Sequence, residues 1–144
     1  MNEWASAPRV GIVHDNTERS MDPWVKELWI EALTGGEYPE GRYYLRQEID
    51  GHSFYDPLGV LTGVAVEHKI TTWERVREDN LWFTPGGAPN RISQTVYEWA
   101  NFKGMHPSQV CPLEWANSLH PIWRLSDHYR LPFEVIADLL ARQY

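Results

Sequence analysis

The dipeptide Asp50-Gly51 lies between two short runs of strand-forming residues and limits the possible folds more than any other feature. Aromatic and branched side chains in residues 43–49 and 52–55 suit a pleated surface. A type I′ turn needs positive φ at both central residues, and Asp-Gly supplies it. We therefore expect a β-hairpin across residues 43–55.

A helix is predicted directly after this hairpin, because Asp56 can cap its N-terminus and Pro57 suits its first position. The helix should continue through Val66. Gly59 and Gly63 are four residues apart, so they share one face of it. Since glycine lowers helix stability, we interpret this pair as a place where another segment packs closely.

An earlier helix is predicted from Pro23, with Ser20 or Asp22 as its cap and Gly35-Gly36 at its end. Its apolar residues recur with helical spacing and form one face. They are Val25, Leu28, Trp29, Ala32 and Leu33.

The remaining pattern predicts a second hairpin from 71–77 and 81–83, although Thr71 and Glu74 also match a helix capping box. Further helices are expected from Ser93 through Ala100 and over residues 112–119, 123–129 and 132–140. The fold class is therefore a single small α+β domain over residues 20–144, with a small antiparallel sheet or hairpins packed with four or five helices. Residues 1–19 are expected to form an arm or a short strand at 9–14.

Composition and charge exclude several classes of function. The net charge of −7 argues against binding of bulk DNA or RNA, which needs a basic face. No apolar run reaches the length of a membrane span, so we expect no membrane partner. Cys111 is single and is predicted to be buried. The eight tryptophans exceed what one small core needs, and homo-oligomerisation would cover the surplus.

No motif for catalysis, metal or cofactor is present. The six histidines lack helical metal-ligand spacing, and Gly86-Gly87 is not followed by the Lys-Ser/Thr of a phosphate loop. A hydrolase would have to combine serines and histidines that carry no motif, namely Ser53, Ser126, His52, His120 and His128. Asp56 and Asp127 could act as an acid–base pair, but capping of a helix and of the turn before Pro132 is the commoner role.

The residues that best fit ligand binding combine guanidinium groups with aromatic rings, which hold phosphates and stack on bases. The first set is Arg46, Tyr55, Trp82 and Arg91, and the second is Trp123, Arg124 and Asp127. The alternative for Arg46 is a solvent-exposed side chain or a pair with Glu48 or Asp56.

Short segments in the same order resemble a family of small uncharacterised phage-encoded proteins. They are Trp29-Ile-Glu-Ala-Leu-Thr-Gly-Gly-Glu-Tyr38, Leu45-Arg46, Tyr55-Asp-Pro-Leu-Gly-Val-Leu61, Leu125-Ser-Asp127 and Phe133-Glu-Val-Ile-Ala137. That family has Trp-x-x-Ala-Leu-x-Ser-Gly-x-Tyr, Leu-Arg, aromatic-Cys-Cys-Leu-Gly-Val-Leu, Leu-Asn-Asp and Phe-x-x-Ile-Ala. Here Asp56 and Pro57 replace both cysteines and Ser126 replaces the asparagine, so thiol chemistry at that pair is absent.

The resemblance implies a phage accessory protein that acts in the host cytoplasm by binding. Its partner would be a small nucleotide-type signal, captured stoichiometrically, or a host defence protein, which it would block. The alternatives are a virion or assembly component and, less favoured by the sequence, a small hydrolase.

Overall fold

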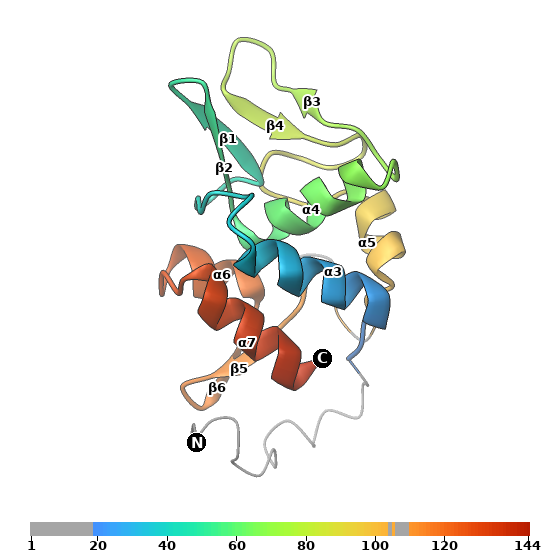
Figure 1. Ribbon diagram of the computed structural model, residues 1–144, viewed down its shortest axis with the longest axis vertical. Coiled ribbons are helices and arrows are strands. Elements are labelled where there is room, and N and C mark those ends of the chain that lie inside the picture. The colour runs from blue at the N-terminus through green and yellow to red at the C-terminus, as the bar shows by residue number, and fades with distance from the viewer. Residues whose placement is uncertain (1–18, 104, 106–109) are drawn as a thin grey trace.

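A computed structural model describes residues 19–103, 105 and 110–144, and these form five helices and six strands (Figure 1). This arrangement confirms the predicted α+β class with a small antiparallel sheet. In chain order the elements are α3 (Pro23–Thr34), β1 (Arg46–Ile49), β2 (His52–Tyr55), α4 (Pro57–Glu67), β3 (Glu74–Arg75), β4 (Leu81–Phe83), α5 (Gln94–Ala100), β5 (Leu113–Trp115), β6 (Ser118–His120), α6 (Ile122–Asp127) and α7 (Phe133–Gln143). The strand expected at 9–14 lies outside the described residues.

The two predicted hairpins join through β1 and β4 into one antiparallel sheet with the order β2-β1-β4-β3. Asp50 and Gly51 have φ values of 52° and 80°, as a type I′ turn requires. Strand β1 begins only at Arg46, so the strand expected from residue 43 was placed too early. The reason is that Tyr43 has a φ of 75°, which no strand residue adopts.

The predicted caps of the first two helices are confirmed. The Asp22 carboxylate accepts the backbone N–H groups of Trp24 and Val25, and Asp56 accepts that of Gly59. Pro23 and Pro57 take the first positions of α3 and α4. These caps satisfy amides that have no partner inside the helix.

Both glycines of α4 allow close packing, as predicted. A Cβ at Gly59 would lie 1.7 Å from the backbone oxygen of Leu45, just before β1. A Cβ at Gly63 would lie 2.5 Å from the Tyr38 ring. Helix α4 therefore packs directly on the backbone of Leu45, the residue before β1. This contact fixes the position of the N-terminus of α4.

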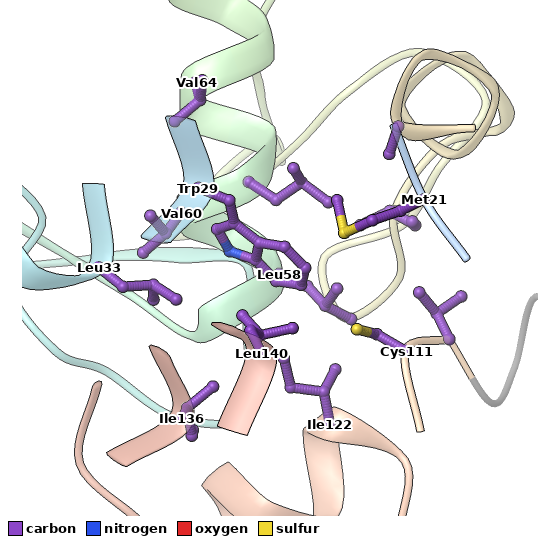
Figure 2. Close-up of a cluster of buried hydrophobic side chains, with 14 of the residues drawn as sticks. Met21, Trp29, Leu33, Leu58, Val60, Val64, Cys111, Ile122, Ile136 and Leu140 are labelled. Carbon is purple, nitrogen blue, oxygen red and sulfur yellow. The ribbon is translucent and has the colours of Figure 1, made fainter. Parts of the chain in front are cut away.

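One hydrophobic core joins α3, α4, α6 and α7 below the sheet (Figures 1 and 2). Trp29 is fully buried in it and donates its indole N–H to the backbone oxygen of Pro57 at 2.8 Å. Cys111 is buried as expected, and its burial raises the pKa of the thiol. A protonated, buried thiol is chemically inert.

The helix expected over residues 112–119 was wrong, because this stretch forms the separate hairpin β5–β6. Ala116 and Asn117 both have positive φ, 52° and 66°, and so form a turn between the strands. The other helices agree with the prediction apart from their ends. Ser93 caps α5, while α6 spans Ile122–Asp127 instead of 123–129.

Candidate functional site

Residues 39–43 lead from the edge of the sheet to the junction of α6 and α7. The Gly41 amide donates to the Tyr55 oxygen at 2.6 Å, and the Tyr55 amide donates to the Pro39 oxygen at 2.8 Å. These two bonds attach the segment to β2. Beyond Gly41 the chain turns toward the C-terminal helices.

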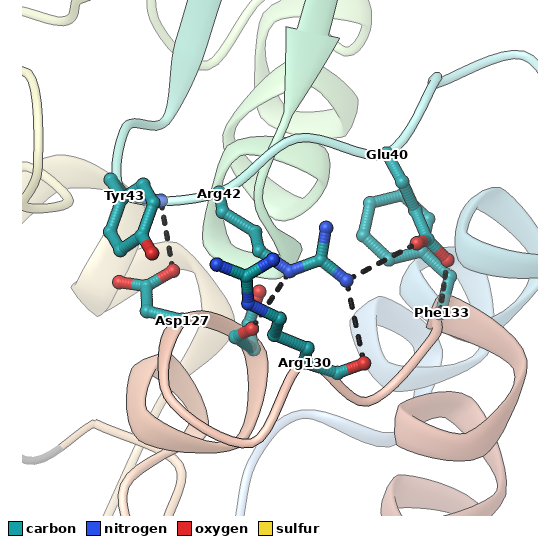
Figure 3. Close-up of polar contacts among 7 residues, drawn as sticks. Glu40, Arg42, Tyr43, Asp127, Arg130 and Phe133 are labelled. Atoms are coloured by element: carbon teal, nitrogen blue, oxygen red, sulfur yellow. Dashed lines mark hydrogen bonds and ion pairs between the residues drawn. The ribbon is translucent and has the colours of Figure 1, made fainter.

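Arg42 fixes this segment to the α6–α7 junction (Figure 3). Its Nε donates to the backbone oxygen of Ser126 at 3.1 Å, and its Nη2 donates to that of Arg130 at 3.4 Å. The same Nη2 lies 4.0 Å from Glu40 Oε2. We call these contacts of Arg42 the arginine clamp.

Glu40 supplies the cap that α7 lacks in its own sequence. Pro132 precedes the helix and provides no side-chain cap, whereas Glu40 Oε1 accepts the backbone N–H of Phe133 (Figure 3). A carboxylate at a helix N-terminus is also favoured by the helix dipole. The start of α7 therefore depends on a residue far away in the sequence.

Tyr43 follows the clamp and contacts the end of α6. Its backbone N–H donates to Asp127 Oδ1 at 2.8 Å (Figure 3). A positive φ is unusual for a bulky residue and persists only where the surroundings enforce it. The clamp at the preceding residue and the bond from the Tyr43 amide to Asp127 together hold this conformation.

A pocket of about 600 Å³ opens beside this junction, and we call it the aspartate pocket. It lies among the Tyr43 segment, the start of α4, the 90–92 loop and α6. Its lining consists of Tyr43, Tyr44, Asp56, Leu58, Asn90, Arg91, Ile92, Val110, Trp123 and Asp127. The volume falls within the range of small-molecule sites.

Asp56 is the most buried acidic group of this pocket, with 5% of the residue exposed. Its Oδ1 accepts the Gly59 amide at 2.6 Å. Burial raises the pKa of the Asp56 carboxyl to about 8, and the charge of Asp127 adds to the rise, against the lowering by the Gly59 and Leu58 amides. Asp56 is therefore largely protonated at neutral pH.

Asp127 lies on the other side of the pocket and is half-buried. Burial raises the pKa of its carboxyl, while the Tyr43 amide and the Arg42 charge lower it. Among residues 19–103, 105 and 110–144, neither Asp56 nor Asp127 forms an ion pair. The pocket therefore holds two carboxyl groups without a cationic partner in contact.

The structure brings together three of the seven residues predicted for ligand binding. Arg91, Trp123 and Asp127 line the aspartate pocket. Arg124 is adjacent, with its guanidinium carbon 5.4 Å from the centroid of the Trp123 ring. Arg91 belongs to the first predicted set and Trp123 and Asp127 to the second, so the pocket combines members of both.

Arg46, Tyr55 and Trp82 form a separate cluster on the sheet, where they are direct cross-strand neighbours. The guanidinium carbon of Arg46 lies 4.2 Å from the Trp82 ring centroid, 5.5 Å from that of Trp73 and 5.9 Å from that of Tyr55. Its Nε donates to Ser53 Oγ at 3.0 Å. We call this the Arg46 cluster.

The pairs suggested for Arg46 are therefore wrong. Glu48 accepts the indole N–H of Trp82 at 3.3 Å, and Asp56 faces the aspartate pocket. Aromatic rings take the place of a carboxylate beside the guanidinium, since the faces of these rings attract cations.

Asp127 does not cap the turn before Pro132, contrary to the expectation, because its carboxylate accepts the amide of Tyr43. The alternative that paired it with Asp56 agrees with their shared pocket. Sequence reasoning missed Tyr43, Tyr44 and Asn90 as lining residues. No local signal could identify them, because their place depends on the clamp and on the fold.

The serines considered for a hydrolase have other roles. Ser53 Oγ accepts a hydrogen bond from Arg46 Nε, and Ser126 is buried in α6. In the described part of the chain neither makes a hydrogen bond to histidine, and no group of three acidic, histidine or cysteine residues could hold a metal. No helix there is long and apolar enough to cross a bilayer.

Comparison with known proteins gives one match. The family described as "Domain of unknown function (DUF8296)" matches residues 21–144. No curated protein and no solved structure matches the chain significantly.

Proposed function

We propose that this chain, which belongs to the DUF8296 family, is a binding protein that captures a small ring-bearing ligand in the aspartate pocket. One observation carries the proposal: Asp56 at the start of α4 and Asp127 at the end of α6 converge on one pocket with aromatic side chains in its lining. A mainly apolar lining with a few convergent polar groups is typical of ligand sites.

The lining determines what kind of ligand would fit. Tyr43, Tyr44 and Trp123 offer ring faces for stacking, while Leu58 and Ile92 offer apolar contact. An ionised carboxylate only accepts hydrogen bonds, and a protonated one can also donate. The ligand should therefore present N–H donors toward the two aspartates.

A nucleotide-type ligand, as expected from the sequence, is one member of this class. Its base would stack on Trp123 and direct its amino group to the carboxylates, and its phosphate would contact Arg91 at the exposed rim. Stoichiometric capture of such a signal in the cytoplasm of a bacterial host is the form of binding that we propose, and the resemblance to phage proteins bears on the origin of the chain. Blockade of a host defence protein and a role in particle assembly remain predictions.

A second candidate function is acid–base catalysis, and the different surroundings of Asp56 and Asp127 favour it. Burial raises the pKa of the Asp56 carboxyl to about 8, which suits a general acid near neutral pH, and Asp127, which lies near the Arg42 charge, would be the partner that acts as general base. This version predicts turnover of many substrate molecules per protein molecule. Binding predicts a stoichiometric complex.

The test of the binding proposal uses the indole signal of Trp123 in a nitrogen–proton NMR spectrum, assigned with Trp123→Phe. Nucleoside monophosphates and their free bases are titrated in turn, and native mass spectrometry searches for a ligand retained from the cell. A shifted Trp123 signal or a retained mass that is lost in Asp127→Asn supports the proposal. Absence of both overturns capture of a nucleotide-type ligand, and the proposed binding function is overturned if the Trp123 signal responds to no ring-bearing probe, charged or neutral.

The control variant is Asp50→Asn. Asp50 is exposed in the β1–β2 turn, where asparagine is equally suited to positive φ. It removes the same charge at a distance from the pocket, so it should bind like the wild type. Equal loss in both variants would show that overall charge, and not the pocket, controls binding.

A further inference from the structure

More acidic than basic side chains face the aspartate pocket. Asp56 and Asp127 face it, and Arg91, which is exposed, is the one cationic residue among the described residues that line it. Arg42 lies close enough to lower the pKa of Asp127, but its guanidinium donates its hydrogen bonds to the backbone oxygens of Ser126 and Arg130. In the described part of the chain, neither carboxyl of the pocket therefore has a cationic group in contact.

The aromatic side chains of the pocket favour the same kind of ligand. Tyr43, Tyr44 and Trp123 line it, and the faces of such rings attract ammonium and guanidinium groups. The Arg46 cluster demonstrates this preference within the same molecule, since three rings surround one guanidinium there. Carboxylates and aromatic rings together form a lining suited to cations.

We propose that the aspartate pocket takes an organic cation with a flat or ring-shaped body, such as an aryl amine, amidine or guanidine. The inference rests on the proposed function and narrows it. A nucleotide would bring phosphate charges toward two carboxyl groups and one exposed arginine, whereas a cation would pair with Asp127 and favour the ionised form of Asp56.

Binding of this cation is expected to release a proton from Asp56. Its pKa is about 8, so it is protonated in the free protein at neutral pH, and a cation stabilises the ionised form. The other titratable or charged groups that face it are Asp127, Tyr43, Tyr44 and Arg91. Affinity for the cation should therefore rise with pH until about pH 8 and then level off.

The experiment compares three probes of nearly the same shape: benzamidine, which is cationic, benzamide, which is neutral, and benzoate, which is anionic. Each is titrated against the full chain by calorimetry and by the Trp123 indole signal. We expect benzamidine to bind at least about tenfold more tightly than benzamide, because hydrogen bonds between charged groups are roughly twice as strong as neutral ones. Benzoate should bind least.

Calorimetry in two buffers with different ionisation enthalpies then measures the proton released. Benzamidine binding should release a proton in the wild type and in Asp50→Asn, and release should be lost in Asp56→Asn. Equal affinity of all three probes at the Trp123 signal would overturn the cation inference and leave the proposed binding function standing. No binding of any probe, or proton uptake with benzamidine, would overturn the inference too.

Discussion

The backbone N–H of Tyr43 donates to Asp127 Oδ1 at 2.8 Å, between residues 84 positions apart in the sequence. This bond joins the chain that enters the sheet to the end of α6 and positions one acid of the aspartate pocket. We expect Asp127→Ala to lose about 1 kcal/mol of unfolding free energy, as for one hydrogen bond, because the Tyr43 amide loses its acceptor. Asp127→Asn should lose less, since its amide oxygen can still accept. Urea unfolding measures both, and equal losses would contradict this role.

Arg42 should stabilise the same junction through its planar guanidinium. Arg42→Ala should cost roughly 1.5–3 kcal/mol, because two charged hydrogen bonds to the backbone oxygens of Ser126 and Arg130 are lost. Arg42→Lys should recover only part of it, since an ammonium cannot reproduce the two-pronged geometry. Arg77 is exposed, and Arg77→Ala is the matched control for removing one positive charge.

The Arg42 variants should also change the pKa of Asp127, which a stability measurement alone would not detect. The charge of Arg42 lowers the pKa of Asp127, so Arg42→Ala should raise it and Arg42→Lys should change it less. Carbon NMR of the Asp127 carboxyl during a pH titration measures this directly. An unchanged Asp127 pKa in Arg42→Ala would show that the clamp acts on the backbone only.

Asp56 should make the fold less stable as pH rises. Its pKa is raised from 3.8 to about 8 in the folded protein, so the folded state binds more protons than the unfolded state between these values. The contribution of Asp56 to stability is therefore complete below about pH 4 and is lost as pH rises through about 8. Urea unfolding at a series of pH values should show this decline.

Asp56→Asn should remove that part of the pH dependence. Asparagine caps helices about as well as aspartate, so the bond to the Gly59 amide is kept and no charge is buried. The variant should be more stable than the wild type near pH 8, with a smaller difference near pH 5. Asp22→Asn changes the same residue type at the cap of α3 and is the control. A wild-type slope in Asp56→Asn would assign the pH dependence to other groups.

The sequence predicted those parts of the fold that depend on local chemistry. The turn at Asp50-Gly51 and the caps Asp22, Asp56 and Ser93 each need only residues within a few positions. The helix expected over residues 112–119 failed because alternation and helical spacing are hard to separate in a short apolar run. The hairpin turn requires a positive φ at Ala116, and the conformational preference of alanine gives no sign of it.

The aspartate pocket could be predicted only in fragments. Arg91, Trp123 and Asp127 were chosen for their chemistry, and the sequence suggested a pairing of Asp56 with Asp127 only as an alternative. Nothing in the sequence indicates that Arg91 and Trp123 share a pocket with these two residues. Tyr43 was assigned to a strand because of its side chain. Its actual conformation is imposed by contacts with residues more than 80 positions away, which local patterns cannot report.

A substitution of Arg46 tests whether ligand binding uses the Arg46 cluster or the aspartate pocket. We expect Arg46→Met to leave binding at the aspartate pocket unchanged, because Arg46 lies among the rings of Trp73, Trp82 and Tyr55 and is absent from the pocket lining. It should reduce stability by about 1–2 kcal/mol through the lost cation–π contacts. Titration of the Trp123 signal checks the first part. Loss of binding in a folded Arg46→Met protein would restore Arg46 as a ligand residue.

Gly59 should tolerate no side chain, whereas Gly63 should tolerate a small one at a cost. An alanine Cβ at Gly59 would lie 1.7 Å from the Leu45 oxygen and 2.5 Å from its carbonyl carbon, and these are backbone atoms that cannot move alone. Relief would require shifting α4 away from the sheet, so we expect a loss of at least about 3 kcal/mol despite the gain in helix propensity. In Gly63→Ala the contact is with side-chain atoms of Tyr38 and not with backbone, so the loss should be smaller. Thermal unfolding followed by circular dichroism ranks the two variants. If Gly59→Ala unfolds at the wild-type temperature, the close contact between α4 and Leu45 does not fix the position of the N-terminus of α4.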